Sequence, residues 1–214
     1  MEEYNENTFM NYLDNMSVFC PYITPAINKG LIENKNFHFG EEDYNINEIE
    51  FSIFWITVSE IERFRRKRNN LSKPNKLLLN FNLIFTFSNE KILQDNPNML
   101  EWTHFLAKNL YTSYGITFGK FHKNAHEIIT NNKKMKSPPY THFPIRSSVV
   151  SKDIKFFDKT PYLIKEVTRS YDDGSSPLKN ITFKELNHLT NKERRDIYKK
   201  LVEDGINLLY TTPK

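Results

Sequence analysis

The spacing of apolar residues predicts a long helix in the first third of the chain. Ile49, Ile53 and Ile61 recur at helical intervals within residues 47–68. Residues 51–58 are also rich in β-branched and aromatic side chains, so a strand is the competing interpretation there. We favour the helix, because the apolar spacing continues beyond that stretch.

Two apolar runs predict strands of a central sheet. Residues 77–87 have the continuous apolar character of a buried strand, and residues 116–121 follow as a second one. Between them, Asn96 and Pro97 predict the start of a helix, and Gly115 predicts its end. The pattern also predicts short helices over 8–16, 24–30 and 162–169 and short strands over 37–39 and from Val149.

The last 40 or so residues differ in organisation from the rest. Residues 172–177, DDGSSP, have the composition of a linker. Two capping-box patterns follow, Thr182 with Glu185 and Thr190 with Glu193, and the second predicts a helix to Asp204 that ends at Gly205. We therefore expect an α/β (or α+β) fold, a layered central sheet with flanking helices and a C-terminal helical extension. The expected units are an α/β domain over 1–171, a linker over 172–179 and the extension over 180–214.

Composition limits the classes of function. The net charge of +4 over 214 residues is too small to indicate nucleic-acid binding. The sharpest basic run, Arg63–Arg68, falls at a predicted helix C-terminus and carries no aromatic stacking platform, which favours a solvated helix end. A single cysteine excludes an internal disulfide, and no apolar run is long enough to cross a membrane. The start of the chain is unlike a signal peptide, so we expect a soluble cytoplasmic protein.

The middle of the chain carries the candidate chemistry. Residues 115–148 read as a strand followed by a long polar connection, which is where a reactive site is expected. His122 and His126 have i, i+4 spacing and would share a metal on a helix, whereas solvated loop histidines are the competing interpretation. His122 alone, at a strand end, suits an axial haem ligand or a general base, or is simply held by a backbone carbonyl. His142 is the third histidine of this stretch.

Two further segments offer candidate ligands or anchors. The Cys20 thiolate, before Pro21, is a soft ligand for haem iron, zinc or copper, although a lone cysteine is more often a buried small hydrophobe. Arg146 with Ser147 and Ser148 offers a guanidinium fork and two hydroxyls for a carboxylate, a phosphate or a haem propionate, or forms an ordinary surface turn. The usual dinucleotide, nucleoside-triphosphate, serine-hydrolase and zinc-protease motifs are absent.

These motifs carry a family resemblance. Residues 19–26, FCPYITPA, resemble the Cys-Pro-Phe opening of an uncharacterised bacterial domain family. That family also has Phe-His-Pro and Pro-Leu-Arg-Ser-Pro motifs, matched here by residues 119–122, GKFH, and 144–148, PIRSS. The resemblance covers roughly residues 19–162 in the same order. Lys123 and Ser148 depart from it, since each replaces a proline.

The same layout is also similar to the YqcI/YcgG family, which includes a haem-dependent N-hydroxylase. This similarity implies a haem cofactor and a haem-dependent oxidase or N-oxygenase that acts on a small amine or amino acid in specialised metabolism. His122 would be the proximal iron ligand, Cys20 the alternative ligand, and Arg146 with Ser147 the anion anchor, with His122 and Arg146 lining one cavity. The alternative is a non-catalytic binding or protein-interaction domain without cofactor. The expected partner is a small-molecule substrate, with a homodimer left open and neither nucleic acid nor membrane expected.

Overall fold

A four-stranded mixed sheet forms the centre of the molecule. The computed structural model describes residues 3–40, 45–89, 91–96, 98–123, 128–129, 133–134, 136–178, 181 and 183–211. The strands lie in the order β1, β2, β6, β3. β1 runs parallel to β2, whereas β6 is antiparallel to both β2 and β3. Their bounds are β1 Ile32–Phe39, β2 Asn80–Phe87, β6 Thr141–Ser147 and β3 Ile116–Phe118.

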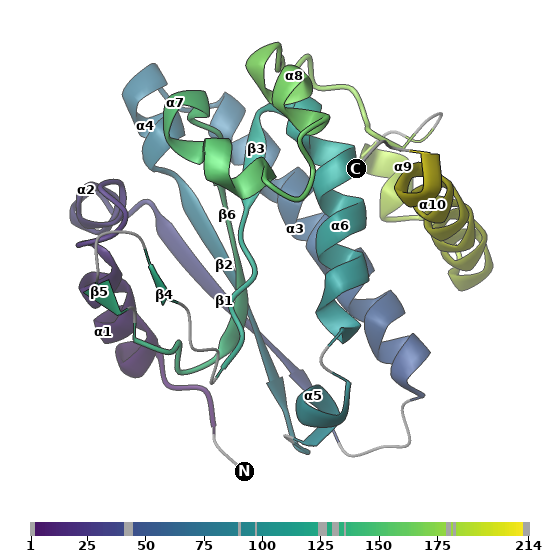
Figure 1. Cartoon of the computed structure of the whole chain (residues 1–214), viewed down its shortest axis with the longest axis horizontal. Coiled ribbons are helices and arrows are strands. Elements are labelled where there is room, and N and C mark those ends of the chain that lie inside the picture. The colour runs from purple at the N-terminus through teal and green to yellow at the C-terminus, as the bar shows by residue number, and fades with distance from the viewer. Residues whose placement is uncertain are drawn as a thin grey trace.

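Helices cover the two faces of this sheet (Figure 1). One face packs against α3 (Ile46–Asn69) and α6 (Met99–Tyr111), and the other lies beside α1 (Glu6–Met16) and α2 (Ile23–Asn28). The expected layered α/β architecture is therefore confirmed. The remaining elements are α4 Lys73–Leu78, α5 Lys91–Asp95, η1 Thr112–Tyr114, β4 Ile128–Ile129, β5 Lys133–Lys134, α7 Val150–Asp153, η2 Ile154–Phe157, α8 Leu163–Thr168, α9 Phe183–Leu186 and α10 Asn191–Thr211.

The predicted helix over residues 47–68 is confirmed as α3. Its apolar residues pack on Phe81, Leu83 and Phe85 of β2, all fully or almost fully buried, and this burial decides against the competing strand. The solvated-end interpretation of its basic run was wrong in part. Arg65 and Arg68 are buried, and both donate hydrogen bonds to the carboxylate of Asp172.

The prediction of a long polar connection was wrong in part, because residues 141–147 within it form β6, an inner strand of the sheet. Phe143 and Ile145 alternate with polar residues and are fully buried against the main core. Pro144 is tolerated inside a sheet because its nitrogen faces Gly119, just past the end of β3, where Gly119 donates to the Pro144 carbonyl. The expected strand from Val149 is instead the helix α7.

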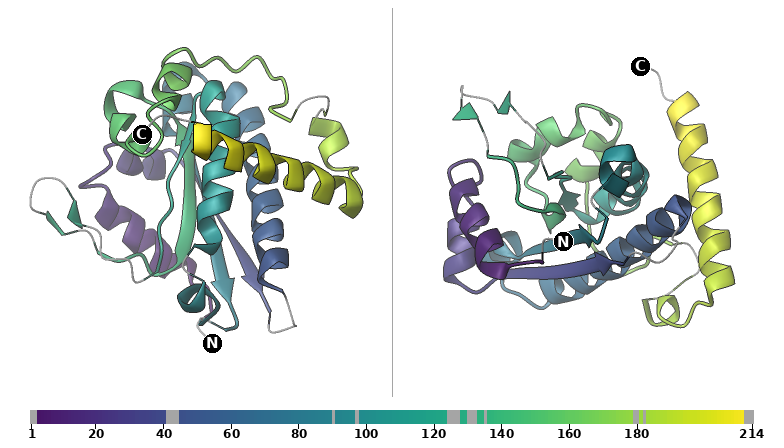
Figure 2. Two further views of the ribbon diagram at one scale, coloured as in Figure 1. Left: turned by 45° about the vertical axis from the view of Figure 1, so that its right-hand side comes forward. Right: turned by 90° about the horizontal axis from the view of Figure 1, so that it is seen from below.

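The C-terminal helix is longer than predicted. Thr190 and Glu193 form the expected capping box, with the Glu193 amide donating to Thr190 Oγ1 over 3.3 Å. The helix does not end at Gly205 but continues to Thr211. It lies across α3 and α6 (Figure 2), and a Cβ at Gly205 would lie 3.0 Å from Leu106. Gly205 is therefore a point of close helix packing. No helix within the described residues is long and apolar enough to cross a membrane.

Candidate functional site

The face of the sheet that lies beside α1 and α2 carries an unusual number of polar side chains. Along β2, Phe81 and Leu83 point into the main core, so Asn80 and Asn82 point to the opposite face. Residues paired directly across an antiparallel ladder share a face, and Asn80 pairs with Arg146. We call this surface the polar face. Its members are Asn34 and Asn36 on β1, Asn80, Asn82 and Thr86 on β2, His142, Pro144 and Arg146 on β6, and Thr117 on β3.

His142 lies at the α1 end of the polar face and is 2% exposed. Its ring stacks on Phe121, with 5.1 Å between centroids, and meets Phe9 and Tyr12 of α1 edge-on. Burial lowers the pKa of His142 to about 4, against a smaller opposing effect of the Tyr140 carbonyl that lies 2.9 Å from Nδ1. The imidazole is therefore neutral at pH 7 and belongs to the packing beneath α1.

Arg146 is held by a carboxylate of its own chain. Its Nη1 donates to Asp153 Oδ2 over 2.9 Å, and its Nη2 donates to Asp153 Oδ1. The Val149 amide donates to the same carboxylate over 2.6 Å, and Asp153 is 1% exposed. This bidentate pair fixes α7 against β6. Ser147, the other expected anchor, donates from Oγ to the Lys76 carbonyl over 2.7 Å.

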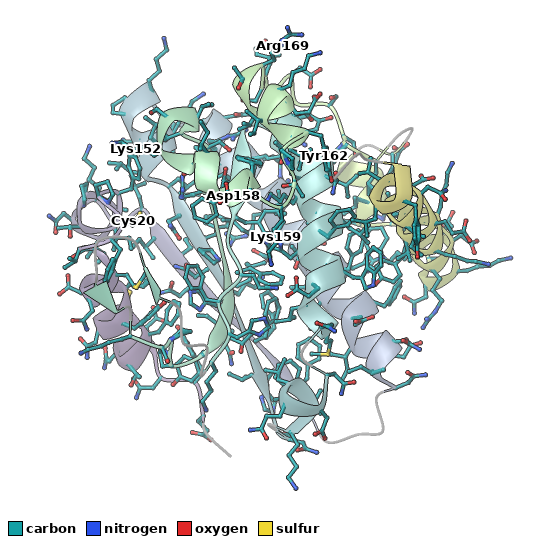
Figure 3. All side chains as sticks on the ribbon, viewed as in Figure 1. Cys20, Lys152, Asp158, Lys159, Tyr162 and Arg169 are labelled. Atoms are coloured by element: carbon teal, nitrogen blue, oxygen red, sulfur yellow. The ribbon has the colours of Figure 1, made fainter. Side chains whose placement is uncertain are left out.

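The connection between α1 and α2 brings Cys20 and Tyr22 to the same side of the sheet. Cys20 packs against the small apolar cluster formed by α1, α2, Ile84 and Tyr140 (Figure 3). The Tyr22 ring lies 6.0 Å from the guanidinium carbon of Arg146. The motif at residues 19–26 and the motif at residues 144–148 therefore meet on the polar face.

Two side-chain oxygens on this face lack partners. Among the described residues, neither Asn80 Oδ1 nor Asn82 Oδ1 accepts a hydrogen bond, although both atoms are buried. Asn82 as a whole is 1% exposed. Each buried polar group without a partner requires an explanation, and among such groups in the described residues only these two share one strand and one face. Asn80 pairs with Arg146 across the ladder, and Asn82 lies two residues further along the same face, so we take Asn80, Asn82 and Arg146 as the candidate site.

His122 lies elsewhere. Phe121 packs on the polar face against His142, so the next residue along the chain points toward α6. The pKa of His104 on α6 agrees with this position. Burial and then the charge of Lys108 lower that pKa to about 4, and His122 is close enough to lower it further by a smaller amount. Burial followed by the charge of Lys120 lowers the pKa of His122 itself.

The structure therefore places His122 and Arg146 on opposite faces of the sheet and does not bring them together. The ring of Phe121 packs closely on Gly119, where an added Cβ would lie 2.8 Å from Phe121 Cε2. His126 lies outside the described residues. Within the described part of the chain, no group of three or more His, Cys, Asp or Glu side chains could hold a metal ion.

Sequence reasoning missed Asn80 and Asn82, although a signal was present. Residues 80–87, NFNLIFTF, begin with alternating asparagine and apolar residues, and this alternation places both amides on one face. An asparagine is depleted from strands, so two of them in a buried strand indicate a local requirement.

Comparison with known proteins identifies a family for the chain. Neither the curated proteins nor the solved structures contain a significant match to the chain. A family model described as "Domain of unknown function (DUF6875)" matches residues 13–181. The match includes all four strands of the sheet and the candidate site, whereas α10 lies beyond it. The expectation of an uncharacterised domain family is confirmed: the chain belongs to the DUF6875 family.

Proposed function

We propose that this protein binds a small polar molecule on the polar face, between Asn80, Asn82 and Arg146. The observation that carries the proposal is the pair of buried, unpartnered oxygens on Asn80 and Asn82. Each such atom costs about 1–3 kcal/mol when it is left without a hydrogen bond. Folded proteins tolerate such costs mainly where a function needs the group, so a ligand that donates to both oxygens supplies the missing partners.

Haem fits these residues poorly. The expected iron ligand His122 faces α6, whereas the expected propionate anchor Arg146 faces α1 and α2 and is bound to Asp153. The Ser147 hydroxyl is likewise engaged by a backbone carbonyl. Haem-dependent oxidation and the relationship to the N-hydroxylases therefore stay predictions from the resemblance. The geometry favours the alternative, a binding domain without cofactor.

Side-chain amide signals in nuclear magnetic resonance spectra test the proposal directly. Uniformly ¹⁵N-labelled protein would be titrated with separate pools of amino acids, aliphatic amines, carboxylates, sugars and nucleosides. We expect at least one pool to shift the Nδ2 signals of Asn80 and Asn82, assigned by mutation. Asn109 is the control, because its amide donates to Phe105 and accepts from Tyr162 on the far side of α6. If every pool leaves the Asn80 and Asn82 signals in place, the proposal is wrong.

A further inference from the structure

We infer that the ligand is a small zwitterion, with an ammonium group toward Asn82 and Asn80 and a carboxylate toward Arg146. This inference rests on the proposed function and names the ligand class for that site. Three features lead to it: the fixed orientation of the Asn82 amide, the spare donors of Arg146, and the apolar residues that flank the site.

A chain of hydrogen bonds fixes which end of the Asn82 amide faces the site. The Glu6 carboxylate can only accept, so Asn34 Nδ2 must be the atom that donates to it over 2.7 Å. Asn34 Oδ1 then points toward Asn82 and accepts from Asn82 Nδ2 over 2.8 Å. The remaining atom of Asn82 is therefore its oxygen, and this assignment follows from the network rather than from the shape of the amide. The free group is an acceptor and requires a donor on the ligand.

Arg146 supplies the opposite chemistry next to it. A guanidinium has five N–H donors. Three hydrogen bonds engage Arg146 within the described residues, two to Asp153 and one to the Ser147 carbonyl. The remaining donors suit an acceptor group such as a carboxylate. Because Asn80 and Arg146 are paired across the ladder, both side chains leave the sheet on the same face and at the same level.

The flanks of the site are apolar. Ile32 pairs with Asn80 on one side, and Ile84 lies two residues beyond Asn82 on the same face. Both contact the cluster that includes Met16 and Ile23 of the two covering helices. A ligand with a zwitterionic head and a short apolar body therefore matches both the polar centre and its surroundings.

Three probes that share one apolar body separate the two head groups. They are L-leucine, which has both groups, 3-methylbutylamine, which has only the ammonium, and 4-methylpentanoate, which has only the carboxylate. We expect calorimetry to show L-leucine binding at least tenfold more tightly than either single-headed probe. Asn82→Val should weaken L-leucine binding at least tenfold, while Asn36→Val, the same change elsewhere on the polar face, should leave it unchanged. Arg146→Lys keeps the charge beside Asp153 but loses the fork, so it should weaken L-leucine and not 3-methylbutylamine.

The outcomes also separate this inference from the proposed function. Equal affinity for L-leucine and 4-methylpentanoate would overturn the ammonium assignment. Equal affinity for L-leucine and 3-methylbutylamine would overturn the carboxylate assignment. If sugars or nucleosides shift the Asn82 signal and the three probes do not, the zwitterion is wrong and the binding site stands. If no molecule shifts that signal, both fail.

Discussion

Replacing Asn82 with valine should make the ligand-free protein more stable. Asn82 is almost completely buried, and its oxygen has no partner among the described residues. Removing that oxygen recovers about 1–3 kcal/mol, and losing the bond from Nδ2 to Asn34 costs about 0.5–1.5 kcal/mol. Valine also suits a strand better than asparagine does. The expected net gain is about 1 kcal/mol, which corresponds to a rise in Tm of about 2–4 °C for a chain of this size.

Thermal unfolding followed by circular dichroism, without added ligand, measures this change. Asn36→Val is the matched control, because the Asn36 oxygen already accepts from Thr86 Oγ1 over 3.1 Å. It should not stabilise the protein, since it removes a satisfied group. A Tm of Asn82→Val several degrees below that of the wild type would show that the Asn82 oxygen is satisfied in the folded protein. The argument for the site would then lose its basis.

Three other perturbations test the packing around the site. Burial holds His142 neutral with a pKa of about 4, so its contribution to the free energy of unfolding should be full above pH 6.5 and fall by about 1.4 kcal/mol per pH unit between pH 6.5 and 4. Urea titrations should show a smaller loss of stability between pH 7 and pH 5 for His142→Phe than for the wild type. Asp153→Ala leaves Arg146 without its carboxylate and should cost about 3–5 kcal/mol in urea unfolding; a loss below about 1 kcal/mol would contradict the buried pair. Gly205→Val should displace α10 and red-shift Trp102 fluorescence, because a Cβ at residue 205 would lie only 3.0 Å from Leu106 and next to the Trp102 indole; an unchanged spectrum would contradict the close packing.

The elements that the sequence predicted well have local causes. The periodicity of α3 and the continuous apolar run of β2 each indicate their own structure. Gly115 also follows a local rule, since it has a φ of 68° at the end of the helical segment, a backbone conformation that glycine adopts without strain.

The elements that were missed depend on contacts distant in sequence. β6 contains Pro144 and several polar residues, so it looks like a loop until β2 and β3 are placed on either side of it. The fork of Arg146 suggested an external anion, and only the fold brings Asp153 to it. From the sequence, Gly205 could either end a helix or permit close packing, and only the position of α6 against residue 205 shows that it permits close packing. Alternation along β2 could have identified the two asparagines, but their lack of partners is a property of the folded chain.

The hydrogen-bond chain from Glu6 gives the site a polarity that is set at a distance. Each asparagine amide carries a donor at one end and an acceptor at the other. Because the Glu6 side chain accepts, the free end of the Asn82 amide in this hydrogen-bond series is also an acceptor. An acceptor at residue 6 yields an acceptor at Asn82, and a donor there would turn both amides over and present N–H groups to the ligand instead. In the proposed site, a residue of α1 would therefore set the preference for a donor or an acceptor group, two side chains away from the ligand. Glu6 precedes residues 13–181, so the residue that would set the selectivity of the proposed site lies in a segment that the family match does not include.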